Sequence, residues 1–358
     1  MDKTLTYVVA ILAIIALVVA SYGFVAFQGQ VADLESSNTN LENSISDIQG
    51  TLTDIQEQIG EYQSNITALE EELSQYKEIT LMDDMGNVVV LTAPPERIVS
   101  LAPSNTEILF AVGAGDKVVG VTDVCDYPYD FAAWVEAGNM SSIGNYWQPA
   151  VEPIIALDPD LVFASTASEE AAETLRSLGY NVLIVEPKTI NGVLESILLI
   201  GRATGNPVEA GELVSELRQR IDTVVNTASQ ADSTPKVYHE VWGPDIQSAG
   251  PGTFIDELIT LAGGENIFHD AISSFPIVSS ETVIEKNPDV IIFPHMYMGT
   301  TSWGTYEDIA NRPGWNTISA IQNDNFHIID ASIISRSGPR LADALEILAE
   351  MIHPELFG

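Results

Sequence analysis

Aromatic side chains and one arginine are the residues whose types and positions could do chemistry in this sequence. They follow expected strands, and aromatic rings in such loops suit the flat faces of a large ligand. Arg336, in "SRSGPR", would either meet a ligand carboxylate or amide or cap a helix. Core packing is the alternative for the aromatic residues. The candidate binding residues are Tyr127, Tyr146, Trp147, Trp242, Tyr297, Trp303 and Arg336.

Motifs of catalysis and nucleotide binding are missing from the sequence. It contains no phosphate-binding loop, no strand-linked Gly-x-Gly-x-x-Gly and no Gly-x-Ser-x-Gly. His239-Glu240 lacks the second histidine of a zinc protease, and the five histidines have no ligand spacing. His295 alone follows an expected strand. We therefore expect a binding protein, with no catalytic residues, no resident cofactor and no metal site.

One phrase occurs twice, as "EPIIALDPDLVFAS" from Glu152 and as "ETVIEKNPDVIIFPH" from Glu281. In both copies Pro-Asp follows the glutamate at the same spacing and leads into a short apolar run. Such a run is typical of a buried parallel strand after a helix and a turn. A single copy would mean little, because Pro and Asp favour turns anyway. Two copies predict two similar lobes.

Composition excludes some partners. Acidic residues outnumber basic ones by 51 to 14, which gives a net charge of −37 and argues against nucleic acid. An acidic, solvated surface suits a salty medium, where exposed charges are screened. The single cysteine, Cys125, excludes an internal disulfide and a thiolate metal cluster.

The first residues predict a membrane anchor. No charged residue occurs from Thr4 to Phe27, a stretch long enough to cross a bilayer core of about 30 Å. A cleaved signal has a shorter apolar core, and a lipoprotein signal needs a cysteine after it. We favour an uncleaved anchor with the rest of the chain outside the cell. The sequons at Asn65 and Asn139 are usable only on that face.

A heptad pattern follows the anchor and predicts a coiled-coil stalk. Asn38 fills the one seam position that is not apolar, and a buried Asn there often fixes register and strand number. We expect the stalk to oligomerise; the alternative is one amphipathic helix packed on the body. The apolar seam positions are Val31, Leu34, Leu41, Ile45, Ile48, Leu52, Ile55, Ile59, Tyr62, Ile66, Leu69, Leu73 and Tyr76.

Strand and helix patterns alternate through the rest of the chain, which predicts an α/β fold with parallel sheets in two lobes and a ligand cleft between them. "SNTE" at residues 104–107 reads as a capping box that opens a helix. The predicted parts are a transmembrane anchor (1–28), a coiled-coil stalk (29–79), an N-terminal lobe (80–190), an inter-lobe helical linker (191–231) and a C-terminal lobe (232–358).

Several stretches resemble the substrate-binding proteins of ABC importers for cobalamin and iron–siderophore complexes. They include "RIVSLAPSNTEILFAVGAG", "AGPGTFIDELITLAGGENIF" and "SRSGPRLADALEILAEMIHPELF", and together they cover residues 81–358 in order. The resemblance implies two lobes joined by a rigid helix, with modest closure on the ligand. "CDYP" and "GNYWQP" are more similar to the cobalamin branch. The anchored coil departs from the usual form of the family and indicates a cell without an outer membrane, such as an archaeon.

The resemblance also implies a role for the repeated phrase. In the family, a glutamate on each lobe docks on arginines of the permease, and by position these are Glu152 and Glu281. Both would also stabilise helix N-termini as first-turn acids. The ligand is then cobalamin or a ferric siderophore, and the partner is an ABC permease/ATPase complex. The alternatives are a zinc or manganese receptor, which needs ligands from both lobes, and a sensor or structural protein whose stalk is the working part.

Overall fold

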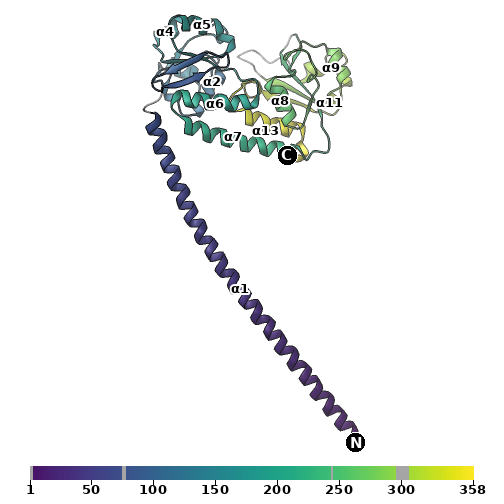
Figure 1. Cartoon of the computed structure of the whole chain (residues 1–358). Helices are drawn as coiled ribbons and strands as arrows, with labels where there is room; N and C mark the ends of the chain where they lie inside the picture. The colour runs from purple at the N-terminus through teal and green to yellow at the C-terminus, as the bar shows by residue number, and fades with distance from the viewer. Residues whose placement is uncertain (1–2, 75–77, 243–244, 296–305) are drawn as a thin grey trace. The chain divides into compact units, whose positions relative to one another are not determined.

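The computed structural model describes residues 3–74, 78–242, 245–295 and 306–358, and the chain divides into two compact units (Figure 1). The first unit contains one helix, α1 (Lys3–Ser74), of 72 residues. Its described side chains from Val8 to Leu69 are all exposed. The helix is long and apolar enough near its N-terminal end to cross a membrane.

The second unit, Lys77–Gly358, holds two lobes of strands and helices. Elements of the first lobe are β1 (Ile79–Met82), β2 (Val88–Leu91), β3 (Ile98–Ser100), α2 (Pro103–Ala111), β4 (Val118–Val121), α3 (Phe131–Glu136), β5 (Ser141–Ser142), α4 (Val151–Ala156), β6 (Leu161–Ala164), α5 (Glu169–Ser177) and β7 (Val182–Ile184). Its main sheet has the order β5-β4-β3-β6-β7 and is parallel throughout, while β1 and β2 form an antiparallel pair.

The second lobe repeats the plan. Its elements are β8 (Lys236–Trp242), β9 (Gln247–Ser248), α8 (Phe254–Leu261), β10 (Glu265–Asn266), α9 (Ser280–Lys286), β11 (Val290–His295), α10 (Tyr306–Ala310), α11 (Ser319–Gln322), β12 (Phe326–Asp330), α12 (Ala331–Ser335), α13 (Leu341–Ile352) and α14 (Pro354–Phe357). Strands β10-β8-β11-β12 are parallel, and β9 pairs antiparallel with β8. The predicted α/β fold with parallel sheets is confirmed.

Two helices connect the lobes where the family resemblance implied one rigid helix. α6 (Ile190–Thr204) ends at Gly205, whose left-handed backbone (φ +81°) a side chain would strain, and Pro207 then begins α7 (Pro207–Ala228). In Figure 1, α7 runs beside α6 and α13 below both sheets. One continuous apolar core includes residues of α6, α7, α8 and α13, so the connection is packed rather than loose.

The repeated phrase folds in the same way in both lobes. α4 leads through a turn into β6, and α9 leads into β11. In each copy the aspartate after the proline holds the start of the neighbouring strand: Asp160 Oδ2 accepts from the Arg97 backbone N–H at 2.9 Å, and Asp289 Oδ2 accepts from that of Lys236 at 3.0 Å. The repeated residues therefore form the same turn in both lobes, which agrees with the prediction of two similar lobes.

The predicted capping box at the start of α2 is wrong. The helix begins at Pro103 with Ala102 as its N-cap, and no side chain caps it. Pro is favourable in the first turn because its missing N–H would have no helical partner. Glu107 does not turn back to the helix start, because its buried carboxylate has two arginine partners from the other lobe.

A buried histidine makes the second lobe sensitive to acid. His239 lies in β8 with 1% of its surface exposed, and burial lowers its pKa from 6.5 to about 4. The fold therefore holds the neutral imidazole. As the pH falls below 6.5, the unfolded chain binds a proton that the folded chain does not bind until about pH 4, so unfolding becomes more favourable.

We predict that His239→Leu will flatten the pH dependence of stability. The stabilisation from neutral His239 is fully present above pH 6.5, and about 3 kcal/mol of it disappears by pH 4. Urea unfolding of the wild type and the variant at several pH values between these limits measures the difference. His295→Gln, at an exposed position in β11, is the matched control and should keep the wild-type slope. Equal slopes in all three proteins would contradict the prediction.

Candidate functional site

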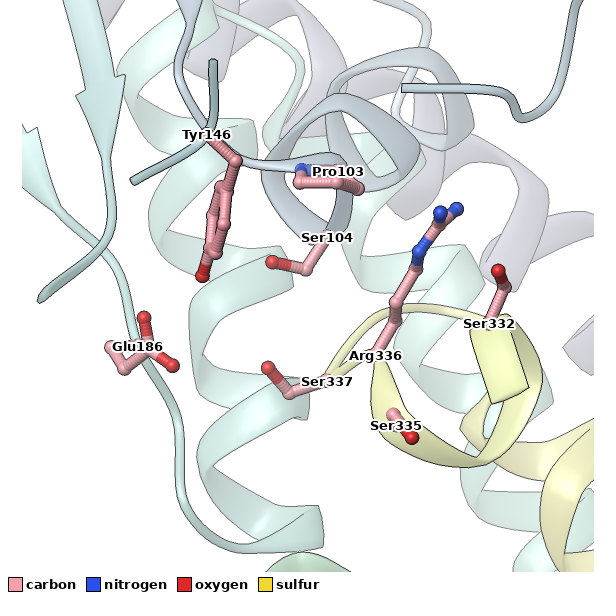
Figure 2. Close-up of a pocket in the computed structure, with 8 residues that line it drawn as sticks. All are labelled: Pro103, Ser104, Tyr146, Glu186, Ser332, Ser335, Arg336 and Ser337. Carbon is pink, nitrogen blue, oxygen red and sulfur yellow. The ribbon is translucent and has the colours of Figure 1, made fainter. Parts of the chain in front are cut away.

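A small polar pocket lies between the two lobes of the second unit (Figure 2). It is lined by Pro103, Ser104, Tyr146, Glu186, Ser332, Ser335, Arg336 and Ser337. Its volume is about 70 Å³, which accommodates one polar group of a ligand and not a whole large molecule. The pocket therefore provides specific polar contacts at one point of the inter-lobe region.

Strand ends position these side chains. Ser104 is in the first turn of α2, which follows β3, and Glu186 comes just after β7. On the other lobe, α12 follows β12 directly and carries Ser332 and Ser335. All these segments come after the carboxyl ends of parallel strands, where ligands bind in open α/β sheets.

Glu107 is the centre of an ion-pair network that joins the lobes. Its carboxylate accepts hydrogen bonds from Arg340 Nε at 2.9 Å and Nη2 at 2.7 Å, and from Arg336 Nη1 at 3.1 Å. The Glu107 side chain is 1% exposed and the arginines are 11% and 13% exposed. A buried carboxylate loses its hydrogen bonds to water. Here a bidentate arginine and a second charged donor replace them.

The same arginines hold the loop that follows β4. Arg336 also bonds the Asp126 carboxylate and donates to the Val124 carbonyl at 3.2 Å. The Arg340 guanidinium lies over the Tyr127 ring, 4.2 Å from its centroid. The second lobe thereby fixes an aromatic loop of the first.

The pKa values of two pocket residues, Arg336 and Glu186, are raised from their ordinary values. Burial works against the charged form of Arg336, yet its bonds to Asp126 and Glu107 outweigh burial and raise its pKa. Burial raises the pKa of Glu186, although the Thr166 backbone N–H, 3.3 Å from its carboxylate, opposes the shift. Arg336 is thus a permanent cation with its partners already in place, and Glu186 is a carboxyl without an arginine or lysine hydrogen-bond partner among the described contacts.

Four of the seven sequence-predicted binding residues have described side chains. Tyr146 and Arg336 line the pocket, and Ser165 donates a hydrogen bond to the Tyr146 hydroxyl at 3.2 Å. Trp147 packs edge-on against Tyr146 with ring centroids 5.4 Å apart and is half exposed. Tyr127 is in the arginine network rather than in the pocket.

The side chains of the other three aromatic residues are not described. Trp242 ends β8, and its backbone alone is described. Tyr297 and Trp303 lie outside the described residues. Their ligand-binding roles stay predictions.

Metal binding has no visible basis in the described part of the chain. Within the ranges the structure covers, no group of three or more His, Cys, Asp or Glu side chains is placed to hold an ion. The zinc or manganese alternative required such a group with ligands from both lobes, so the structure gives it no support.

Comparison with known proteins gives the family. A family model described as periplasmic binding protein matches residues 98–333, more than half of the chain. The chain belongs to the periplasmic binding protein family. The sequence-based resemblance to substrate-binding proteins of ABC importers is confirmed.

Named relatives of this periplasmic binding protein point in the same direction. It is 34% identical over 283 residues to the cobalamin-binding protein of Halobacterium salinarum, covering 77% of this chain and 74% of that one. It is 33% identical over 287 residues to an uncharacterised ABC transporter substrate-binding lipoprotein of Bacillus subtilis, covering 78% and 87%. The solved periplasmic heme-binding protein from Roseiflexus sp. RS-1 has 28% identity and a TM-score of 0.64 over 72% of this chain and 98% of that one. All three are named as binding proteins, consistent with the expectation that this one is not an enzyme.

The two glutamates of the repeated phrase occupy matching places in this periplasmic binding protein. Glu152 is in the first turn of α4 and Glu281 is in the first turn of α9, and both are exposed. Hydrogen bonds from its own backbone N–H and the Ser279 side chain lower the pKa of Glu281. Both places are accessible to a partner, as permease docking requires.

Sequence reasoning missed the residues that join the lobes. Glu107 binds Arg340 across 233 positions of sequence, and Asp126 binds Arg336 across 210. A signal for Glu107 existed, because a carboxylate inside the apolar run "TEILFAV" needs a cationic partner if the helix is buried. Glu186 and the serines around Arg336 gave no comparable signal.

We predict that Glu107→Gln will destabilise this periplasmic binding protein by about 3 kcal/mol, because it leaves two partly buried guanidinium groups with less counter-charge. Urea unfolding at neutral pH measures the loss. Glu136→Gln, on the exposed end of α3, controls for the change of charge and should stay within about 0.5 kcal/mol of wild type. A Glu107→Gln protein as stable as this control would show that the network is dispensable.

Proposed function

We propose that this chain is a membrane-anchored, extracytoplasmic substrate-binding protein that captures a corrinoid between its lobes and delivers it to an ABC permease. The observation that carries the choice of ligand is the charge balance of the inter-lobe pocket. Named relatives support the class, since one is a cobalamin-binding protein and another is an ABC substrate-binding lipoprotein.

Both arginines near the pocket are neutralised from within the protein. Arg336 and Arg340 supply two positive charges, and Glu107 and Asp126 supply two negative ones. Glu186 adds a further carboxyl to the lining. The segments 243–244 and 296–305 contain no charged residue, so they do not alter this balance.

Such a pocket favours a neutral polar group over an anion. The carboxamide side chains of a corrinoid offer donors to Glu186 and acceptors to the serine hydroxyls without adding charge. The propionates of haem or the carboxylates of an anionic chelate would meet Glu186 with no free cation among the described lining residues. A buried, unpaired charge is costly, so the preference is for the corrinoid.

Delivery to the permease is assigned to Glu152 and Glu281. Each is an exposed acid in the first turn of a short helix, and the two helices are equivalent in the two lobes. A pair of matching carboxylates suits a permease that presents basic residues at two equivalent places.

The N-terminal helix supplies the anchor and the stalk. Its apolar stretch is long enough to cross a membrane, and the exposed heptad seam follows in the same helix. We propose that the first holds the protein at the membrane and that the second is a coiled coil. The Bacillus relative is named a lipoprotein, so attachment in that protein has a different chemistry.

An iron chelate is the second candidate ligand, because the Roseiflexus structure is named as a heme-binding protein. Aromatic faces such as those of Tyr146 and Trp147 would suit a porphyrin as well as a corrin. The charge balance is what separates the two ligands.

We predict tight cobalamin binding and weak binding of haem and ferric siderophores. Tryptophan fluorescence in high salt, corrected for ligand absorbance and checked by calorimetry, measures both. Glu186→Gln should strengthen haem binding several-fold and leave cobalamin binding nearly unchanged, because it removes a carboxyl that opposes propionates. Glu170→Gln, on α5, is the matched control. Haem binding that is tighter than cobalamin binding in the wild type would overturn the choice of ligand.

For the docking residues, we predict that Glu152→Ala with Glu281→Ala will reduce ligand uptake by cells at least tenfold while ligand affinity stays at the wild-type value. The reason is that neither residue lines the pocket. Uptake of labelled cobalamin and calorimetry of the purified variant are the two measurements. The exposed pair Glu173 and Glu212, both changed to Ala, should transport normally. Normal uptake by the docking variant would remove the assignment.

A further inference from the structure

The seam of α1 is an apolar stripe without a partner in the described chain. In heptad notation its positions alternate between a, from Val31, and d, from Leu34. From Leu34 to Leu69 the apolar seam side chains are 47–70% exposed. A row of this length exposed to water is unfavourable, so a protein surface is expected to cover it.

One flank of the seam carries a single charge, near its C-terminal end. Between residues 28 and 76 there are ten acidic residues and no lysine or arginine. Six of the ten occupy the outer positions c and f, and three occupy e: Glu35, Glu42 and Glu70. The g positions are neutral apart from Glu72; they are Gln30, Ser37, Ser44, Thr51, Gln58 and Asn65.

This placement discriminates between the two directions of pairing. In a parallel coil each e residue faces a g residue of the partner, so Glu35, Glu42 and Glu70 face Gln30, Ser37 and Asn65. In an antiparallel coil e faces e, and full overlap brings Glu35 of one copy to Glu70 of the other. Like charges at such positions are destabilising, so the sequence disfavours the antiparallel arrangement.

Two further features agree with a two-stranded coil. Asn38 is the single polar residue at an a position, and a lone buried Asn typically sets register and a pair of strands. Its amide donates to Glu42 Oε1 of the same helix at 2.7 Å, which leaves its carbonyl oxygen able to accept from a partner. Gly50 and Gly60 occupy the outer positions f and b, where a missing side chain costs the seam no contact.

We propose that the seam is covered by the same segment of a second copy of this chain, parallel and in register, so that one stalk carries two binding units. The proposal builds on the stalk of the proposed function but not on its ligand. Two units side by side would double the number of loaded sites available at one point of the membrane.

Cysteine cross-linking of the full-length chain in detergent tests the direction and register. The natural Cys125 is buried, and the wild-type chain serves as its control. Ile48→Cys, at a d position, should form an interchain disulfide under mild oxidation. Glu57→Cys, at f, should not.

In a fully overlapping antiparallel coil residue 48 would face residue 59, so cross-linking between Ile48→Cys and Ile59→Cys chains, without self-linking of the first, would overturn the proposal. A sedimentation mass of one chain or of three would also overturn it.

A charge substitution tests the flank independently. Ser37→Lys places a cation opposite Glu42 of the partner in the parallel register, whereas Ser36→Lys, at f, points away from it. Both lie within one turn of Asp33 in their own helix, so they differ mainly in the partner's acid. Ser37→Lys should raise the thermal midpoint of the stalk above that of Ser36→Lys at low salt, and high salt should remove the difference. Equal midpoints at low salt would count against the parallel register. Ligand affinity should be unchanged in every stalk variant, so a failure here is distinguishable from a failure of the ligand assignment.

Discussion

The buried carboxylate of Glu107 is the constraint on which the inter-lobe region depends. It lies on α2 of the first lobe, and both of its arginine partners come from the segment between α12 and α13 of the second. Losing either side of this network would leave a buried charge without compensation, at a cost of several kcal/mol. The network therefore holds Ser104, Arg336 and Tyr127 in one arrangement before any ligand arrives.

The fold was largely predictable from the sequence because it depends on local patterns. Buried runs such as "LVFA" and "VIIF" become central parallel strands, and the Pro-Asp turns before them were read correctly in both lobes. The similarity of the two lobes extends beyond the repeated residues. Asn181 Nδ2 donates to the Asp160 carbonyl at 3.1 Å, and Asn325 Nδ2 donates to that of Asp289 at 2.8 Å. The break between α6 and α7 has a local cause as well, since Gly205 and Pro207 each have one strong backbone preference.

The site was less predictable because its contacts join residues far apart in the chain. Arg336 and Tyr146 were found through residue type and a strand-end position, and both line the pocket. Glu107 was misread, because "SNTE" satisfies the local pattern of a capping box, and the apolar run around Glu107 does not show which distant cation would pair with it. The protein partner of Tyr127 was not predictable either, since the stacking of Arg340 on its ring is a tertiary contact. The ligand-binding role of Tyr127 stays a prediction.

Rigidity between the lobes has a consequence for how a ligand would bind. α6, α7 and α13 share one apolar core with both lobes, and Arg220 of α7 binds Asp343 and Glu346 of α13 at 2.6 Å. A ligand that enters such a frame orders few protein groups, so little of its binding free energy is lost to reorganisation. Release cannot then rely on the lobes opening by themselves. For the proposed function, docking at Glu152 and Glu281, one on each lobe, would place the permease where it can strain the Glu107 network from both sides at once.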